Sequence, residues 1–248
     1  MGEVAIVTGA RRGIGNAIAE ALGAAGFDVA DVSIEDEPER IADGPNGTRR
    51  GFYREDLSDI ARHADLLDRI AADLGEPTCL VNNAGVTSLQ RGDMLEMTPE
   101  SFDRTLAINL RAGFFLTQAF ARRRLAQPRA AASIVFIGSA NAEIVGENRA
   151  DYCISKAGVA MAAKLFAARL AADGIAVYEV RPGIIRTDMT RPAQERYDAL
   201  IAAGGVPMGR WGEPADIGRA VASLARGAIP YATGIHLDIG GGMHLHRV

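Results

Sequence analysis

Short apolar segments alternate with longer segments of helical periodicity along nearly the whole chain. The apolar runs predict buried strands at 4–8, 28–33, 49–53, 78–82, 133–138, 176–181 and 234–238. Between them, apolar residues recur at helical spacing and predict helices over 13–25, 59–74, 99–126, 150–173, 192–203 and 214–226. This alternation is typical of a parallel sheet with helices on both faces. We therefore predict a single doubly wound α/β domain over residues 1–248, with seven parallel strands.

One segment interrupts the alternation. Residues 35–48 begin with acidic side chains and contain Pro38, Gly44, Pro45 and Gly47, which favour turns. The alternation of strands and helices resumes directly after this segment. We therefore predict a loop within the domain and not a linker between two domains.

The composition is that of an ordinary globular protein. The chain has 248 residues, 48% of them hydrophobic and 23% charged, with a net charge of -4. Because the chain has no long basic stripe, we do not expect nucleic acid as a partner. No run approaches the ~18 apolar residues of a membrane span, so we expect no membrane partner. The first strand follows Met1 almost directly, which leaves no room for a signal segment, so we expect a cytoplasmic protein. The two cysteines are too few for a disulfide framework or a cysteine metal site, and we expect no metal.

A glycine-rich turn joins the first predicted strand to the first predicted helix. Gly9, Gly13 and Gly15 would let the backbone approach a pyrophosphate closely, and the helix N-terminus would offer free N–H donors. This is how Rossmann folds bind dinucleotides. A tight turn without a ligand is the alternative interpretation of the same glycines.

Tyr152 and Lys156 stand four residues apart within one predicted helix, so both side chains lie on one face. A positive charge about 4 Å from a phenol contributes roughly 4 kcal/mol at an effective dielectric of ~20, or about three pK units in favour of phenolate. Of the 27 basic residues only Lys156 and Lys164 are lysine, so the choice of an ammonium here is specific. We predict that Lys156 lowers the pKa of Tyr152, although a chance pairing on an ordinary helix would give the same spacing.

Six motifs together resemble the classical short-chain dehydrogenase/reductase family, in its order and over nearly the whole chain. The motifs are Thr8-Gly9-x-x-x-Gly13-Ile14-Gly15, Asn82-Asn83-Ala84-Gly85, Asn109, Ser139, Tyr152-x-x-x-Lys156 and Pro182-Gly183-Ile184-Ile185-x-Thr187. Within the family the chain looks most like 3-oxoacyl-acyl-carrier-protein reductases, with support from segments 207–216 and 238–241.

The resemblance implies roles for individual residues. Tyr152 would exchange a proton with the substrate oxygen, Lys156 would lower its pKa and hydrogen-bond the nicotinamide ribose, and Ser139 would hold the substrate oxygen. Asn109 would order a water that links Lys156 to solvent. The implied cofactor-binding residues are Gly9, Arg11, Arg12, Gly13, Ile14, Gly15, Ser33, Asp56, Leu57, Asn83, Ala84, Gly85, Tyr152, Lys156, Pro182, Gly183, Ile185 and Thr187.

The choice between the two nicotinamide cofactors depends on the end of the second strand. An acid is expected there for the ribose hydroxyls of NAD, but Ser33 occupies the position. Arg12 resembles a basic position of NADP-dependent members and could bind the 2'-phosphate. Asp31 or Glu35 could return an acid to the ribose. We favour NADP(H), with NAD(H) as the alternative.

The sequence thus predicts an NAD(P)(H)-dependent oxidoreductase that interconverts a ketone and a secondary alcohol, similar to 3-oxoacyl-thioester reductases. A polyol or sugar dehydrogenase is the alternative substrate class, because 140–149 carries Glu143, Glu147 and Asn148. A dinucleotide-binding sensor without turnover and an isomerase that uses the cofactor transiently are the alternatives of other classes. We expect 186–212 to form a lid over the substrate, and the resemblance implies a homotetramer built on the apolar faces of 102–120 and 157–170.

Overall fold

A computed structural model of the chain describes residues 2–35, 40–127 and 131–245. Within these ranges eight strands form one sheet in the order β3-β4-β2-β1-β5-β6-β7-β8. The strands are β1 (Val4–Thr8), β2 (Asp28–Ser33), β3 (Arg40–Asp43), β4 (Arg49–Arg54), β5 (Pro77–Asn82), β6 (Ala132–Ile137), β7 (Ile175–Pro182) and β8 (His236–Ile239). All neighbouring strands are parallel except β3 and β4. The chain therefore has the predicted doubly wound architecture.

The strand count corrects the sequence prediction from seven to eight. Residues Arg40–Asp43, which we expected to be loop, pair antiparallel with β4, with Arg40 opposite Phe52. Three of the four residues of β3 are exposed, so this edge strand has no apolar run by which it could be recognised. The expected turn residues Gly44 and Pro45 do connect the two strands. Pro38, the other turn signal, lies outside the described residues.

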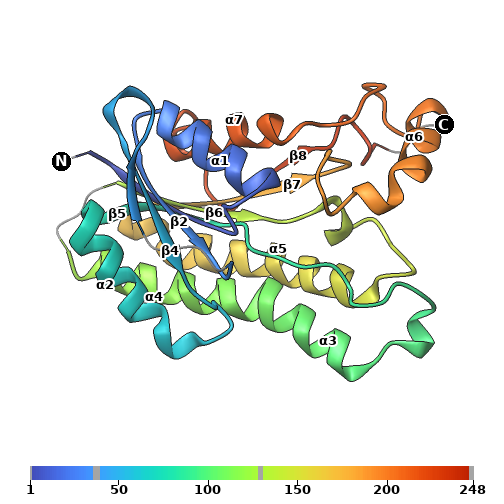
Figure 1. Cartoon of the computed structure of the whole chain (residues 1–248), viewed down its shortest axis with the longest axis horizontal. Coiled ribbons are helices and arrows are strands. Elements are labelled where there is room, and N and C mark those ends of the chain that lie inside the picture. Colours follow the sequence, from blue (N-terminus) through green and yellow to red (C-terminus); the bar gives the residue numbers. More distant parts are fainter. Residues whose placement is uncertain (1, 36–39, 128–130, 246–248) are drawn as a thin grey trace.

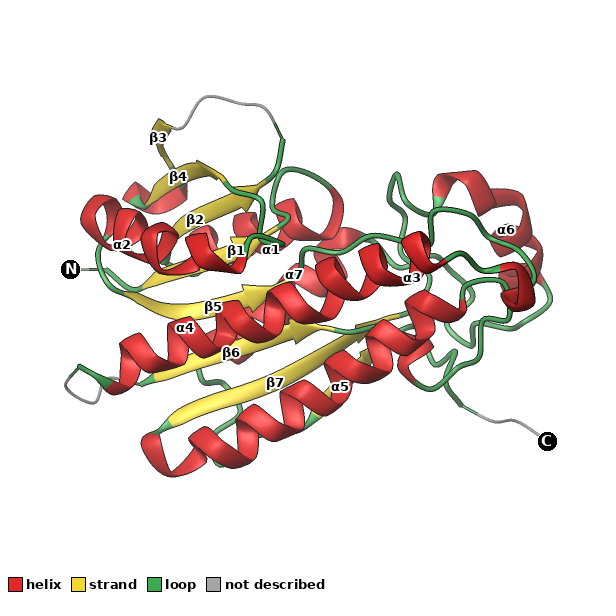
Figure 2. Cartoon of the chain, turned by 90° about the horizontal axis from the view of Figure 1, so that it is seen from below, coloured by secondary structure: helices red, strands yellow, loops and turns green. Residues whose placement is uncertain are grey.

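Two layers of helices cover the sheet (Figure 1). Helices α1 (Gly13–Ala24) and α7 (Pro214–Ala225) pack on one face, around a core that includes Ile18, Leu22 and Ile217. Helices α2 (His63–Leu74), α4 (Gly113–Leu125) and α5 (Ala150–Leu170) cover the other face. Figure 2 shows α3 (Pro99–Leu106) and α6 (Gln194–Ala202) near one end of the molecule, beyond the carboxyl ends of the parallel strands. These end segments and the strand ends together surround the candidate site.

A glycine fixes the contact between α1 and α7. A Cβ added at Gly218 would lie 2.5 Å from the carbonyl oxygen of Ala17, too close for any other residue. The helix that follows the glycine-rich turn is therefore held directly against α7. The N-terminus of α1 lies at the carboxyl edge of the sheet because the glycine-rich turn connects it directly to the end of β1.

The predicted helix over 99–126 begins with Pro99 in its first turn, as expected, but it is not uniform. Its middle, Ala107–Ala112, is a π-helix between α3 and α4. Segments of this kind are often found at functional sites because the wider turn redirects side chains. Asn109, one of the predicted catalytic residues, lies in this segment.

The described residues contain no helix long and apolar enough to cross a membrane.

Candidate active site

The carboxyl ends of the parallel strands border one large cavity of about 1050 Å³. This is where ligands bind in open α/β sheets. Ser139, Tyr152 and Lys156 line it. Every predicted cofactor residue lines it too: Gly9, Arg11, Arg12, Gly13, Ile14, Gly15, Ser33, Asp56, Leu57, Asn83, Ala84, Gly85, Pro182, Gly183, Ile185 and Thr187. Residues far apart in sequence are thus brought around one site.

The glycine-rich turn has a backbone that only glycine adopts easily. Gly9 and Gly13 have φ angles of +66° and +56°. A Cβ at Gly15 would lie 2.1 Å from the carbonyl oxygen of Gly9. Arg12, the residue before α1, makes no side-chain capping hydrogen bond, so the first N–H groups of the helix have no side-chain partner there. This end of the cavity therefore fits the pyrophosphate of a dinucleotide.

Asn83 holds the turn in place from the neighbouring strand. Its amide nitrogen donates to the carbonyl oxygens of Thr8 at 2.8 Å and Gly9 at 3.2 Å. The Thr8 hydroxyl accepts hydrogen bonds from the backbone N–H groups of Asn83 and Ala84, both at 2.9 Å. Asn83 lines the cavity, but its side-chain amide is occupied in joining the ends of β1 and β5.

Ser139 follows the end of β6 and has two hydrogen-bonding functions. Its hydroxyl accepts a hydrogen bond from the backbone N–H of Asn141 at 3.1 Å and so caps the short turn Ala140–Ala142. The same side chain hydrogen-bonds to the phenol of Tyr152. The capping role that we considered as the alternative is therefore present together with the contact that catalysis requires.

Tyr152 and Lys156 lie one turn apart on α5, as their spacing predicts. The Lys156 ammonium is 5.8 Å from the centroid of the Tyr152 ring. Its Nζ also donates a hydrogen bond of 2.8 Å to the carbonyl oxygen of Ile137 at the end of β6. The lysine is thereby anchored to the sheet beside the strand that presents Ser139.

The protonation of this pair differs from the expectation. Burial raises the pKa of Tyr152, although the hydrogen bond with Ser139 and the charge of Arg149 act in the opposite direction. Our prediction of a lowered pKa for Tyr152 is therefore wrong for this arrangement, because desolvation of the phenolate outweighs both the hydrogen bond with Ser139 and the charge of Arg149. Burial also lowers the pKa of Lys156 to about 8, and the carboxylate of Glu179 opposes that decrease.

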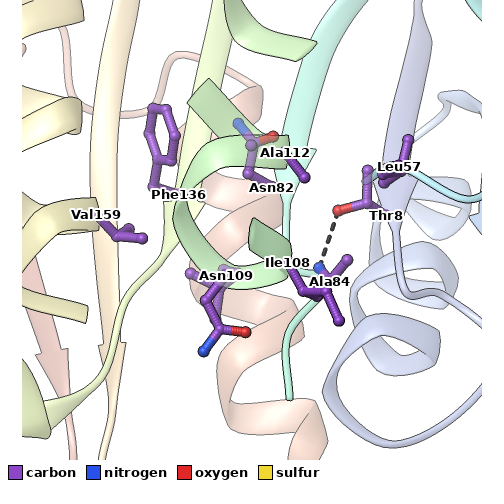
Figure 3. A pocket seen from close by; sticks show the side chains of 11 residues that line it. Thr8, Leu57, Asn82, Ala84, Ile108, Asn109, Ala112, Phe136 and Val159 are labelled. Carbon is purple, nitrogen blue, oxygen red and sulfur yellow. Dashed lines mark hydrogen bonds between the residues drawn. The ribbon is translucent and has the colours of Figure 1, made fainter. Parts of the chain in front are cut away.

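Asn109 joins two elements beside the cavity. Its Oδ1 accepts a hydrogen bond from the N–H of Val86 at 2.8 Å, and its Nδ2 donates to the carbonyl of Val86 and the hydroxyl of Ser155, both at 3.0 Å. Figure 3 shows Asn109 among the residues that line a second, small cavity, which Thr8 and Ala84 also line. That cavity measures about 10 Å³, at the lower limit for one water molecule. The water-ordering role of Asn109 stays a prediction.

Three predicted residues border the cofactor end of the cavity with opposite charges. Arg11 packs over the ring of Phe52, with 5.4 Å between its guanidinium carbon and the ring centroid. Arg12 is far more exposed, and its Nη2 is 3.4 Å from a carboxylate oxygen of Glu35. Asp56 accepts two hydrogen bonds from Ser58. The acid that faces the arginines is thus Glu35, two residues beyond Ser33.

Asp151 is a residue of the site that the sequence analysis missed. It is fully buried directly before Tyr152, and its carboxylate accepts hydrogen bonds from Ser88, Ser101 and Thr105. Burial alone would raise its pKa, but these hydrogen bonds and the N–H of Tyr152 outweigh burial, and the pKa is lowered. An acid in the first turn of an otherwise apolar helix is a weak sequence signal.

Glu179 is the second residue that the sequence analysis missed. It is buried on β7, and its Oε1 is 2.9 Å from Nε of Arg181. A Cβ at Gly138 would lie 2.2 Å from Oε1, so the carboxylate fills the space left by this glycine, directly before Ser139. No sequence motif indicated this position.

Comparison with known proteins is consistent with this geometry. A family model described as "Enoyl-(Acyl carrier protein) reductase" matches residues 9–244. The chain is 36% identical to a 3-oxoacyl-[acyl-carrier-protein] reductase of Escherichia coli over 245 residues, 98% of each chain. It is also 36% identical to the D-threitol dehydrogenase of Mycolicibacterium smegmatis, over 97% of this chain and 92% of that protein.

Solved structures that resemble the chain also include 3-oxoacyl-[acyl-carrier protein] reductases. The crystal structure of a 3-oxoacyl-[acyl-carrier protein] reductase from Brucella melitensis in complex with NAD matches with a TM-score of 0.94 and 42% identity. The match covers 100% of this chain and 99% of that one. The likeness therefore includes the whole sheet, both helical layers and the segments around the cavity.

Proposed function

Since the chain belongs to the short-chain dehydrogenase/reductase family, it is a nicotinamide-dependent oxidoreductase that interconverts a ketone and a secondary alcohol, and we propose that Tyr152 is its proton donor. One observation carries the proposal: the Tyr152 phenol, hydrogen-bonded to Ser139, lines the large cavity one turn from Lys156. The dinucleotide, when bound, supplies or accepts the hydride.

Tyr152 has the protonation state that reduction requires. Because burial raises its pKa, the phenol stays protonated at neutral pH and holds a proton for the carbonyl oxygen of the substrate. Ser139 provides a second hydroxyl to the same oxygen, and Lys156 provides a fixed positive charge beside the phenol. In the direction of alcohol oxidation, the same tyrosine accepts the proton.

We infer that the substrate is a 3-oxoacyl thioester. The relatives named above include two 3-oxoacyl-[acyl-carrier-protein] reductases. The polar residues that favoured a polyol, Glu143, Glu147 and Asn148, do not line the cavity, whereas Ile144 and Val145 of the same segment do. The carboxylate of Glu143 is instead bound by Arg181 at 2.5 Å. A polyol remains the alternative because of the likeness to the threitol dehydrogenase.

A substrate screen tests this proposal. We expect purified protein to oxidise NADPH or NADH with a 3-oxoacyl thioester, followed by nicotinamide absorbance, and to turn over polyols more slowly. Faster reduction of NAD⁺ or NADP⁺ with polyols would reverse the order of the two substrate classes. Cofactor binding without turnover of any ketone or alcohol would identify a sensor, and substrate conversion without net cofactor turnover would identify an isomerase.

We propose that NADP(H) is the preferred cofactor, bound at its 2'-phosphate by Arg12. The Arg12 side chain is 72% exposed at the cavity, and its contact with Glu35 at 3.4 Å is long enough to be exchanged. A phosphate binds a guanidinium more strongly than a distant carboxylate does. NAD(H) is the alternative, because Glu35 could accept hydrogen bonds from ribose hydroxyls and the similar Brucella protein was crystallised with NAD.

Two variants decide between the cofactors. Arg12→Ala is expected to raise the Kd of NADPH about 10-fold or more, because a charge-assisted hydrogen bond is lost, and to leave the Kd of NADH nearly unchanged. Glu35→Gln should shift the preference further toward NADPH, since it removes the competing acid. Both constants are measured by nicotinamide fluorescence titration. Equal changes for NADPH and NADH in Arg12→Ala would contradict the phosphate contact.

We further propose that the protein assembles as a homotetramer through α5 and that segment 186–212 acts as a lid. Ile154, Met161 and Leu165 of α5 are 49%, 55% and 58% exposed, and their spacing places them on one side of the helix. Thr187, Asp188, Met189 and Thr190 of the lid line the cavity. The predicted cytoplasmic location stays a prediction.

The double variant Met161→Glu/Leu165→Glu tests the assembly. Two buried carboxylates in an apolar interface would be costly, so we expect a smaller species in light scattering after size exclusion. Leu95→Glu is the control, because Leu95 is 80% exposed outside α5. An unchanged mass of the double variant, or a monomeric wild type, would contradict the use of α5.

A further inference from the structure

The loop after β5 continues along the cavity beyond the predicted cofactor residues Asn83, Ala84 and Gly85. Its residues 86–89 line the cavity, and they form neither a strand nor a helix. A segment of this kind has no backbone ladder to hold it, so its position depends on the partners that its polar groups find. Ser88 is its most deeply buried residue, at 5% exposed.

Asp151 connects this loop to two helices. Its Oδ1 accepts hydrogen bonds from the hydroxyl of Ser88 and from the backbone N–H of Tyr152, the latter at 2.7 Å. Its Oδ2 accepts hydrogen bonds from two hydroxyls of α3, that of Ser101 at 2.8 Å and that of Thr105 at 3.0 Å. One carboxylate thus joins the cavity loop, α3 and the first turn of the helix that carries the proposed proton donor.

A second contact holds the loop through the same carboxylate. The backbone N–H of Leu89 donates to the hydroxyl of Ser101 at 3.2 Å, and that hydroxyl in turn donates to Asp151. Val86, at the other end of the segment, is held separately by the side chain of Asn109. Residues 88–89 are therefore anchored to the residue directly before Tyr152, one of them directly and the other through Ser101.

The burial of this carboxylate makes the link a firm one. Asp151 is 0% exposed. The largest influences on its pKa are burial and these hydrogen bonds, and no cation is among them. A buried charge needs hydrogen bonds in place of those with water, and the N-terminal turn of α5 adds a favourable dipole. Each donor that moved away would leave part of the charge unsatisfied, so the donors are held in place.

We propose that Asp151 is a positioning residue, which fixes residues 88–89 of the cavity wall relative to Tyr152 and so sets how far a bound ketone lies from the phenol. The inference rests on the proposed function, because it concerns the substrate of the same site. A general acid has to lie within hydrogen-bonding distance of the oxygen that it protonates, and a displacement of about 1 Å is enough to slow the reaction. Asp151 itself does not line the cavity, so it acts through Ser88 and Tyr152.

Ser88→Ala tests the link, because it removes one hydroxyl and keeps the carboxylate. We expect KM for acetoacetyl-N-acetylcysteamine to rise about 10-fold, as for a lost hydrogen bond to a charged group, and Kd for the nicotinamide cofactor to change by less than about twofold. The amide hydrogens of 86–89 should exchange faster, as measured by mass spectrometry. Lower stability alone would reduce the active fraction, and with it kcat, without changing KM.

Two changes at Asp151 separate this link from a direct contact between Ser88 and the substrate. Asp151→Ala leaves the Ser88 hydroxyl at the cavity and should still raise KM by a similar factor. Adding Ser88→Ala to it should raise KM no further, because both changes break the same link. Asp151→Asn should restore most of the lost affinity, since its amide oxygen has to face the N–H of Tyr152 and therefore still accepts from Ser88.

Thr117→Val is the matched control. Thr117 is also 0% exposed, its hydroxyl accepts a hydrogen bond from Asn82 at 2.8 Å, and it lies outside the cavity lining. The control should lose stability but keep the KM and the loop exchange of the wild type.

Three outcomes would overturn the inference: an unchanged KM in Ser88→Ala, unchanged exchange of 86–89 in that variant, or equal effects in Thr117→Val. All three are measured even if Asp151→Ala does not fold. A wild type that turns over no ketone would instead contradict the proposed function. Hydrogen exchange needs no turnover, so it would still decide whether Asp151 holds the loop.

Discussion

Tyr152→Phe is expected to lower kcat by about 10²- to 10⁴-fold, the usual contribution of a positioned general acid. The substitution removes only the phenolic oxygen, which hydrogen-bonds with Ser139 and carries the proton. The ring and its place on α5 remain, so cofactor affinity should stay nearly the same. The measurement is a pair of values for each variant: kcat with a saturating ketone, and the dissociation constant of the nicotinamide cofactor.

Tyr178→Phe is the matched control for this change. Tyr178 is also buried, but it packs in the core between the sheet and the α1/α7 layer, away from the cavity. The control should keep near-normal turnover. If Tyr152→Phe also kept it, Tyr152 would not be the proton donor; if both variants lost activity equally, the loss would reflect general damage to the fold.

The sequence predicted the central sheet well because of how parallel strands are buried. β1 and β6 are buried at every position, so they appear as continuous apolar runs that need no knowledge of their neighbours. β3 could not be recognised in this way. It is held by pairing with β4 at the sheet edge, and such pairing depends on a hairpin and not on burial of its own side chains.

In the candidate site too, the residues that depend on local sequence pattern could be predicted, and those that depend on pairing between distant strands could not. The neighbourhood of Tyr152 and Lys156 follows from helical spacing, and the glycine-rich turn follows from its place between a strand and a helix. Glu179 could not be found in this way. It reaches the site because β6 and β7 pair in a register that sets Phe136 opposite Glu179, and the sequence does not state that register.

The direction of the tyrosine pKa was wrong for a related reason. The sequence shows which charges are near in the chain, but the cost of burying a phenolate depends on the whole surrounding structure. Burial raises the pKa of Tyr152 and lowers that of Lys156, so burial favours the neutral form of both groups and moves their pKa values apart. The neutral phenol and the charged ammonium are the forms that ketone reduction uses.

Lys156→Met is expected to lower kcat/KM by about 10²- to 10³-fold, because it removes the fixed positive charge beside the reacting groups. Lys156→Arg keeps a charge but replaces a compact ammonium by a wide planar fork, which cannot make the same hydrogen bond of 2.8 Å to the carbonyl of Ile137 without displacement. We therefore expect Arg to restore little. Full activity in Lys156→Met would remove the lysine from the mechanism.

The pH profile gives a sharper test of the same residue. Burial lowers the pKa of Lys156 to about 8, so the charged form is present below that pH and is lost as the pH rises through it. Activity should therefore fall above about pH 8, whereas Tyr152, with its raised pKa, should remain protonated there. Glu179 supports the charged lysine, and Glu179→Gln should move this fall to a lower pH. Glu147→Gln, an exposed change of the same kind outside the cavity lining, should leave it in place. Thermal unfolding of each variant is measured as well, to show that the protein is still folded. If Glu179→Gln is folded and its pH profile is not shifted, the Glu179 carboxylate does not act on Lys156.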